Sequence, residues 1–203
     1  MPSPALHEAG AGEREGRTAI PDALLPYQQR WVADRTQLKI AEKSRRIGLT
    51  WAEAADDALL AATSRRAGGM DVFYMGYNLD MAREFIEDCA EWSRAYHQAA
   101  SAVGEEVFKD FDEVTGDTRE IRAFRITYPS GHKIVALSSA PRSLRGMQGK
   151  VVLDEAAFHD DLAGVLKAAL ALLIWGGRVV VISTHNGEDN PFNELINDIR
   201  ARR

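Results

Sequence analysis

The sequence has one cysteine, no long apolar run and no excess of positive charge. The single Cys89 excludes an internal disulfide framework and a zinc site built from several cysteines. No apolar run reaches the about 18 residues that a membrane-spanning helix needs, and residues 1–17 lack the apolar core of a signal peptide. A net charge of −5 argues against a protein that permanently coats nucleic acid. We therefore expect a soluble, intracellular protein that contacts nucleic acid only through a local patch.

Dense apolar patterning begins at Pro21 and predicts one domain behind a disordered lead. Residues 1–20 are rich in alanine, glycine, glutamate and arginine and have almost no large apolar side chains, which is typical of a disordered tail. We expect residues 21–203 to form a single domain, because the sequence shows neither an internal repeat nor a second boundary.

Strand-like and helix-like segments alternate along this domain. We expect strands at residues 38–42, 71–77, 121–128, 133–137, 150–153 and 178–182. We expect helices at residues 27–35, 51–65, 79–102 and 162–174, and a last helix opening at Asn190-Pro191. Continuous Val/Ile runs predict an α/β fold with a mostly parallel sheet and helices on both faces. Ligands bind such sheets at the carboxyl ends of the strands.

A basic, glycine-containing loop follows the first expected strand. It fits the phosphate-binding pattern G-x-x-x-x-G-K-[ST] in part, because Lys43 replaces the first glycine and Leu49 replaces the lysine. Gly48 would let the backbone approach a phosphate closely, and Thr50 would offer a hydroxyl to Mg²⁺. The candidate phosphate-binding residues are Lys43, Ser44, Arg45, Arg46, Ile47, Gly48, Leu49 and Thr50. The alternative is a basic turn with a helix-capping threonine.

Two adjacent carboxylates, Asp154 and Glu155, end a fully apolar strand. This is the Walker B arrangement, in which Asp154 would hold Mg²⁺ and Glu155 would polarise the attacking water. Neighbouring residues at a strand end point in different directions, so two roles at one site are geometrically natural. A lone acidic pair can also be a strand-to-helix cap. Its place downstream of the candidate phosphate loop favours the Walker B interpretation.

A third polar cluster follows the last expected strand. It consists of Ser183, Thr184, His185 and Asn186. At this place a polar sensor would feel the γ-phosphate and couple hydrolysis to movement; a polar turn with a capping hydroxyl is the alternative. No partner motif gives His185 acid–base chemistry of its own.

Two single residues complete the candidate site. Arg145, beside Gly146, would serve as a finger that stabilises the transferring phosphoryl group in cis or in trans, or it is a plain solvated arginine. Gln28, just before the first strand, offers a donor and an acceptor to an adenine edge, or it is an exposed residue at a helix start.

Together these motifs resemble a family, the large subunits of phage terminases. The loop at residues 43–50 resembles their deviant Walker A motif, of which some members carry the lysine at the start. Asp154-Glu155 resembles their Walker B motif, residues 183–186 match the position of their coupling motif, and Tyr27-Gln28 that of their adenine-binding motif. The likeness covers residues 22–200 in order, and it points to the Mu-like prophage group.

The resemblance implies a RecA-like ASCE P-loop ATPase that uses ATP and Mg²⁺ to move double-stranded viral DNA into a prohead. It also implies a homo-oligomeric ring, monomeric in isolation, that works with a portal protein and a small terminase subunit in the host bacterial cytoplasm. Members of the family carry a C-terminal nuclease domain; since the sequence stops at Arg203, we expect no nuclease activity from it.

Two other functions stay open at this point. A helicase core fragment is one, because Asp154-Glu155-Ala156-Ala157 resembles a DEAD-type box. A scaffold that binds ATP without hydrolysing it is the other, if Leu49 has disabled the loop. DNA-stimulated ATP turnover would separate the motor from the scaffold, and duplex unwinding would identify the helicase.

Overall fold

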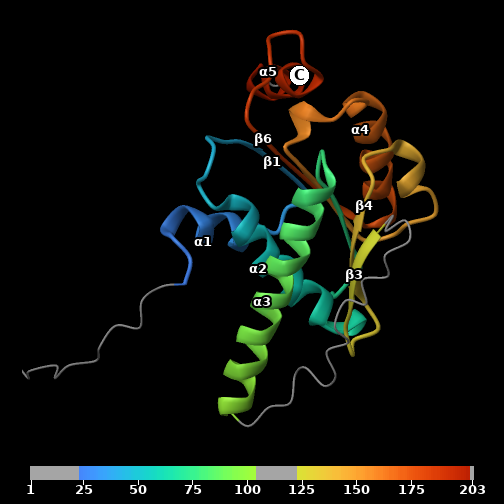
Figure 1. Cartoon of the computed structure of the whole chain (residues 1–203). Helices are drawn as coiled ribbons and strands as arrows, with labels where there is room; N and C mark the ends of the chain where they lie inside the picture. The colour runs from blue at the N-terminus through green and yellow to red at the C-terminus, as the bar shows by residue number, and fades with distance from the viewer. Residues whose placement is uncertain (1–22, 104–122, 202–203) are drawn as a thin grey trace, which may run out of the picture.

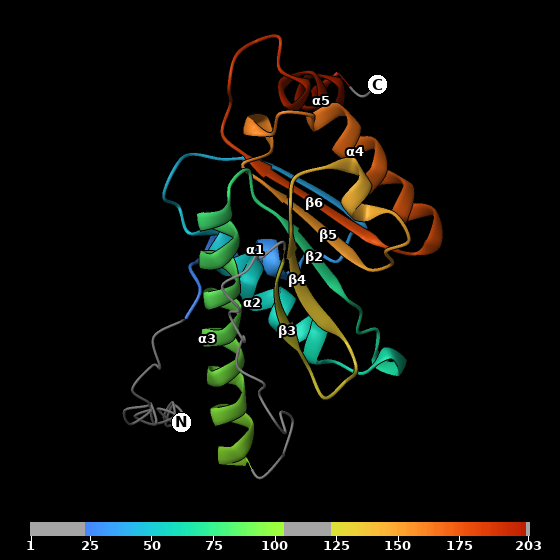
Figure 2. The same cartoon turned by 45° about the vertical axis from the view of Figure 1, so that its right-hand side comes forward.

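A computed structural model describes residues 23–103 and 123–201 (Figure 1). The predicted tail at residues 1–20 lies outside this part. Within it, six strands form one twisted sheet with helices packed on both faces (Figures 1 and 2). The strands are β1 (Leu38–Glu42), β2 (Val72–Met75), β3 (Ala123–Thr127), β4 (Lys133–Leu137), β5 (Lys150–Asp154) and β6 (Arg178–Ser183).

The strand order is β1-β6-β5-β2-β4-β3. All neighbouring strands are parallel except β3 and β4, which form an antiparallel hairpin around residues 129–132. The prediction of a mostly parallel α/β sheet is therefore confirmed. Because β1, β6 and β5 are adjacent and parallel, the segments that follow them emerge at the same edge of the sheet. The third polar cluster, after β6, emerges between the other two.

Five α-helices and four short 3₁₀ helices complete the described fold. The α-helices are α1 (Pro26–Ala33), α2 (Leu49–Ala62), α3 (Leu79–Val103), α4 (Leu162–Leu170) and α5 (Pro191–Arg200). The 3₁₀ helices are η1 (Arg65–Ala67), η2 (Pro141–Leu144), η3 (Ala156–Phe158) and η4 (Ala171–Trp175). Figure 2 shows α2 and α3 on one side of the sheet and α4 and α5 on the other.

The sheet is buried on both faces because successive strand residues point to opposite sides. On β2, Val72 and Tyr74 join the core formed with α2 and α3, whereas Phe73 and Met75 join the core formed with α4 and α5. All four are at most 1% exposed. This double burial explains why the strands have continuous apolar sequences.

Several element boundaries differ from those expected, three of them more than the rest. The helix expected at residues 162–174 is α-helical only to Leu170 and then tightens into η4, a common way for a helix to end. The helix expected at residues 51–65 begins at Leu49 and ends at Ala62, where the Thr63 backbone is extended and its hydroxyl donates to the Leu59 carbonyl over 2.7 Å. The strand expected at residues 71–77 is confined to β2.

A buried ionic cluster ties α2 to β5. The Lys150 ammonium lies 2.6 Å from Glu53, 2.8 Å from Asp56 and 2.6 Å from Asp57, and all four residues are at most 3% exposed. Burial raises the pKa of Asp57 to about 8. In the described residues these acids are the one group of three close enough to share a metal ion, and the lysine ammonium occupies that position. The two elements joined here also carry Thr50, in the first turn of α2, and Asp154, at the end of β5.

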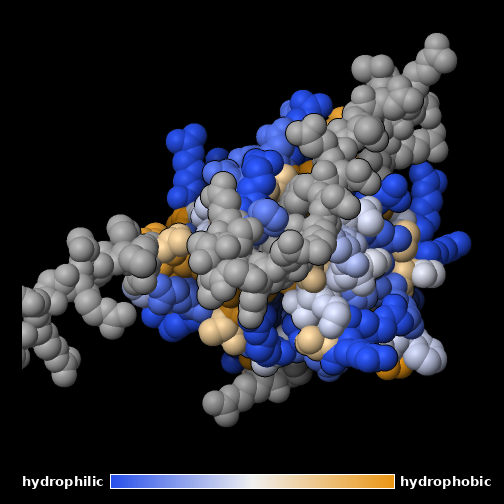
Figure 3. Space-filling model, turned by 90° about the horizontal axis from the view of Figure 1, so that it is seen from below, coloured by the Kyte–Doolittle hydropathy of each residue, from blue (hydrophilic) through white to orange (hydrophobic). Residues whose placement is uncertain are grey.

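The surface gives no sign of a membrane segment. None of the described helices is both long and apolar enough to cross a bilayer. The face seen from below in Figure 3 is mainly hydrophilic where coloured atoms are visible, with hydrophobic residues in small separate groups.

Candidate active site

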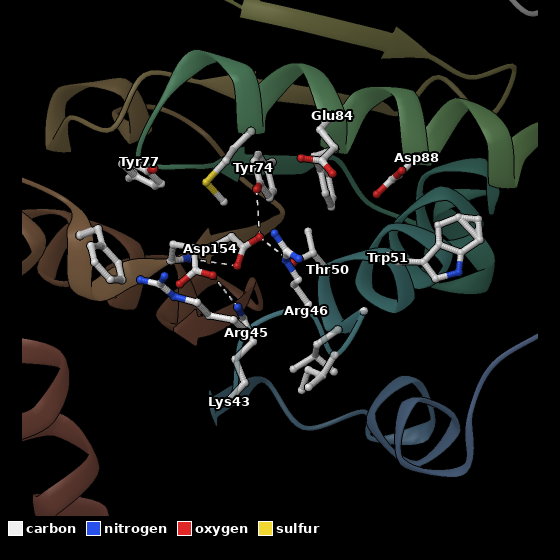
Figure 4. Close-up of a pocket in the computed structure, with 17 residues that line it drawn as sticks. Lys43, Arg45, Arg46, Thr50, Trp51, Tyr74, Tyr77, Glu84, Asp88 and Asp154 are labelled. Carbon is white, nitrogen blue, oxygen red and sulfur yellow. Dashed lines mark hydrogen bonds and ion pairs between the residues drawn. The ribbon is translucent and has the colours of Figure 1, made fainter. Parts of the chain in front are cut away.

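A cavity of about 500 Å³ opens at the carboxyl edge of the sheet, between the loop after β1 and the first turns of α3 (Figure 4). The loop at residues 43–50 lines it, apart from Ser44, and Asp154 and Glu155 lie at its floor. Trp51, Glu84 and Asp88 form the far end. The structure therefore brings the two most specific sequence motifs together around one cavity.

The loop is shaped to present backbone N–H groups. The Lys43 N–H donates to the Ser183 carbonyl over 2.9 Å, which extends the β1–β6 pairing into the loop. Gly48 then takes a left-handed conformation, φ 67°, and begins α2 without any side-chain cap. The first N–H groups of α2 thus point at the cavity unsatisfied by a described side chain, a favourable site for a phosphate. Thr50 lies inside α2 rather than at its cap, so the helix-capping role that the alternative interpretation gave it is wrong.

Position 49, where the usual pattern has its lysine, holds a largely buried leucine. Leu49, the first residue of α2, is 5% exposed and belongs to the core shared with α3. It also contributes to the lining of the cavity. Lys43, at the other end of the same loop, reaches the cavity.

Gln28 lies behind the loop rather than in the cavity. Its amide nitrogen donates to the Gly48 carbonyl over 2.7 Å, and its amide oxygen accepts from the Leu25 N–H over 2.8 Å. A Cβ added at Gly48 would lie 2.9 Å from that nitrogen, so the glycine and the glutamine fit each other. The Tyr27 hydroxyl also donates to the Ile47 carbonyl. These contacts hold the loop backbone, and contact of Gln28 with adenine stays a prediction.

Asp154 is held by donors from three directions. The hydroxyls of Thr50 and Tyr74 donate to its Oδ2 over 2.8 Å and 3.0 Å, and the Glu155 N–H donates to Oδ1 over 2.9 Å. Asp154 is 1% exposed, and this burial raises its pKa, while the two hydroxyls act in the opposite direction. The N-cap residue of η3 is Glu155, and no side chain caps this helix, so the acidic pair does not act as the strand-to-helix cap of the alternative interpretation.

Glu155 faces Lys43. The Lys43 ammonium lies 2.6 Å from Glu155 Oε1, and the Thr184 N–H and hydroxyl lie 3.4 Å and 3.5 Å from Oε2. Glu155 and Arg46, with φ 47° and 58°, are the two non-glycine residues of the described chain in the left-handed region. Such strain persists where the surroundings enforce it, and it concentrates at functional sites. Both strained residues line the cavity.

The third polar cluster connects the acidic strand end to the phosphate-loop strand. Ser183, fully buried, accepts from the Ala157 N–H over 3.0 Å, and the Asn186 amide donates to the Ala157 carbonyl over 3.2 Å. His185 Nε2 lies 2.6 Å from Glu42 Oε1 at the end of β1. The segment therefore contacts both the end of β1 and η3, which directly follows the acidic strand end.

Arg145 lies elsewhere. It is exposed at the end of η2 and lines a separate groove with Leu144, Leu172 and Trp175. It does not line the cavity that holds Lys43 and Asp154. The geometry gives no support to a finger acting on its own subunit, and action in trans stays a prediction.

Two residues that contact Asp154 were not predicted from the sequence. Tyr74 stands in an apolar strand and looks like a core residue, yet its hydroxyl reaches Asp154. His159 lies under the acidic strand end: its Nε2 is 2.9 Å from the Asp154 carbonyl oxygen and its Nδ1 is 2.6 Å from the Ser139 hydroxyl. Burial lowers the pKa of His159, so the neutral ring is favoured. Neither residue carries a sequence signal, because both roles depend on contacts between distant segments.

The oxygen atoms of Asp154 and Thr50 fit a magnesium ion. A carboxylate and a hydroxyl, 2.8 Å apart at the edge of an anion-binding loop, are hard oxygen ligands of the kind Mg²⁺ takes together with phosphates. Thr50 and Asp154 are the residues that would hold it.

Comparisons with known proteins agree with this geometry. The chain is 59% identical over 180 residues to the Mu-like prophage FluMu protein gp28 of Haemophilus influenzae, and 53% identical over 182 residues to the probable terminase large subunit gp28 of Escherichia phage Mu. Each match covers 89% of this chain but only 34% and 32% of the relative, so the chain spans about a third of their length. No model of a protein family matches the chain.

Solved structures share the fold at low sequence identity. The ATPase domain of the Thermus phage P74-26 large terminase aligns with a TM-score of 0.58 at 19% identity, over 82% of this chain and 66% of that one. The HK97 bacteriophage large terminase aligns with a TM-score of 0.57 at 13% identity, over 88% and 37%. The chain is thus a homologue of the Mu-like prophage gp28 proteins, with the α/β fold of large terminase ATPase domains.

Proposed function

We propose that the cavity binds and hydrolyses MgATP. The observation that carries this proposal is the convergence of two pairs from distant segments: Thr50 with Asp154 at 2.8 Å, and Lys43 with Glu155 at 2.6 Å. A phosphate-binding loop, a metal-binding carboxylate and a second carboxylate for the water are the parts that phosphoryl transfer to water requires.

Each residue then has a distinct task. The N–H groups at the start of α2 bind the phosphate oxygens, and Lys43, with Arg45 and Arg46 beside it, offsets their negative charge. Thr50 and Asp154 hold the magnesium ion, which supplies charge neutralisation when bound. Glu155 orients the attacking water and accepts its proton.

Residues 183–186 would couple hydrolysis to movement. Thr184 is near Glu155, Asn186 is bonded to η3, and His185 is paired with the end of β1. A change in the position of Glu155 would therefore reach both β1 and the segment after β5 through this one loop.

In the whole protein we infer a DNA-packaging motor. The support is the homology to the probable terminase large subunit of phage Mu together with the large-terminase ATPase fold. Double-stranded DNA, a portal protein and a small terminase subunit are the partners this inference implies, with subunits arranged in a ring.

The direct test replaces Glu155 with glutamine. Glu155→Gln is nearly isosteric but accepts a proton far more weakly, so ATP binding should persist while turnover falls by about 100-fold or more. Binding is measured with a fluorescent ATP analogue, and turnover by phosphate release with and without double-stranded DNA. Asp198→Asn, on the surface of α5, is the control. Turnover near that of the control would remove Glu155 from this role, and a wild-type chain that binds ATP but never hydrolyses it would favour a scaffold.

A further inference from the structure

Tyr74 is the one side chain from β2 that reaches the acidic strand end. Its ring is fully buried, and its hydroxyl lies 3.0 Å from Asp154 Oδ2. Figure 4 shows it approaching the carboxylate from the α3 side, whereas Thr50 approaches from the loop. Asp154 Oδ2 therefore receives one hydroxyl from each side of the cavity.

The two hydroxyls would have different tasks when a metal ion is bound. A threonine hydroxyl has one proton and two lone pairs, so Thr50 could give a lone pair to Mg²⁺ and still donate its proton to Asp154 Oδ2. The Tyr74 hydroxyl donates to the same oxygen from the other side and would serve only to hold the carboxylate. Together the two donors would fix the direction of Asp154 Oδ2.

The ring of Tyr74 is itself fixed. It stacks on Phe85 of α3 with 3.9 Å between ring centroids and 8° between the planes. Both rings are 1% exposed or less, so the phenol has little freedom to swing away. A rigid donor of this kind orients a metal-ligating carboxylate, and such partners outside the ligand set affect metal affinity strongly.

We propose that Tyr74 is a positioning residue for the metal site: its hydroxyl fixes Asp154 Oδ2 so that the carboxylate faces the metal and the phosphates. This inference rests on the proposed function, because it assigns to Tyr74 a part in holding the magnesium ion that hydrolysis needs. It predicts that Tyr74 matters for binding of the metal and not for binding of the nucleotide itself.

The test measures metal affinity directly. Mn²⁺ replaces Mg²⁺, and free Mn²⁺ is read by electron paramagnetic resonance in the presence of a slowly hydrolysed ATP analogue. Tyr74→Phe removes only the hydroxyl and keeps the stacked ring. It should weaken Mn²⁺ binding by about 10-fold, the lower end of the range for such outer partners, and leave analogue binding in EDTA unchanged within about twofold.

Three further variants separate positioning from packing. Tyr77→Phe removes a phenol hydroxyl from the same cavity, where the residue is 49% exposed. Phe85→Leu loosens the stack but keeps the Tyr74 hydroxyl, so it should weaken Mn²⁺ binding less than Tyr74→Phe does. Tyr77→Phe should leave Mn²⁺ affinity within about twofold of wild type. Tyr74→Met fills the space without a hydroxyl and should reproduce the loss. Thermal melting shows that each variant is folded.

The outcomes separate the role of Tyr74 from the proposed function. Mn²⁺ affinity unchanged in folded Tyr74→Phe and Tyr74→Met overturns the inference and leaves the proposed function intact. An equal loss in Tyr77→Phe also overturns it, because removal of any phenol hydroxyl from the cavity would then suffice. Absence of any Mn²⁺–nucleotide binding in the wild-type chain instead removes the proposed function, and the inference with it.

Discussion

The ammonium of Lys43 lies 2.6 Å from the carboxylate of Glu155, although 112 residues separate them in the sequence. The pair is mostly shielded, with side-chain exposures of 7% and 19%. The contact joins the two motifs on which the proposed chemistry depends. It also shows that the lysine at the start of the deviant loop reaches the cavity, although position 49 holds a leucine.

Loss of the buried lysine should destabilise the fold severely. Lys150→Met leaves Glu53, Asp56 and Asp57 buried without their shared cation, and breaking a buried ion pair in this way costs about 3–5 kcal/mol. Urea denaturation at pH 7 measures this loss. The loss should shrink toward pH 5, because carboxylates without a cation take up protons more readily. The control is Lys133→Met, because the Lys133 side chain is 39% exposed. This variant should lose under about 1 kcal/mol of stability. Equal stability of the two variants would show that the cluster is not stabilising.

Asp88 gives a pH-dependent prediction. Burial, with the neighbouring Glu84, Glu91 and Glu87, raises the pKa of Asp88 from 3.8 to about 6. The folded state therefore binds this proton more tightly than the unfolded state, so the carboxylate lowers stability as the pH rises through this range. Relative to wild type, Asp88→Asn should have no added stability near pH 4. Its stability advantage should grow between pH 4 and 6 and stay constant above pH 6. Allowing for solvent screening at this half-buried site, the gain is about 1 kcal/mol, or about 2–4 °C in Tm.

Thermal melts of Asp88→Asn and wild type at pH 4.5 and 7.5 check this. Asp198→Asn, which removes the same charge from an exposed position on α5, serves as the reference. A gain that is the same at both pH values, or larger at pH 4.5, would contradict the sign of the effect.

We expect Arg145 to act on a phosphate of a neighbouring subunit and not on one bound to its own. It lines a groove away from the cavity, so Arg145→Ala should leave turnover of the monomeric chain unchanged. In an assembled oligomer, mixing Arg145→Ala with Glu155→Gln subunits should recover part of the activity that each lacks alone. The mixed oligomer is verified by native mass spectrometry. Lack of recovery in a proven mixture would assign Arg145 a purely structural part.

The order of motifs along the chain was enough to predict the sheet and the three segments that meet at its edge. Strands that lead into Lys43, Asp154 and Ser183 end at one edge once they are parallel, and local pattern alone predicts that. Local pattern does not tell which face of the sheet a given strand residue points to, or what it meets there. Tyr74 and Phe73 are adjacent and similar in character, but only one faces Asp154. Gln28 and Arg145 are polar residues near motifs in sequence, and the packing of α1 and η2 places both outside the cavity.

The most direct test of the account is ATP turnover by Lys43→Ala. Lys43 is the only lysine of the loop, and its flexible stem can follow a phosphate through the reaction. Loss of such an electrostatic stabiliser costs about 100-fold or more in turnover, whereas Arg46→Ala should cost less and Lys133→Ala nothing. Steady-state phosphate release at saturating MgATP, with and without double-stranded DNA, measures all three. A fall of about two orders of magnitude confined to Lys43→Ala is the predicted result; near-normal turnover in that variant would contradict the account and shift the role to Arg45 or Arg46.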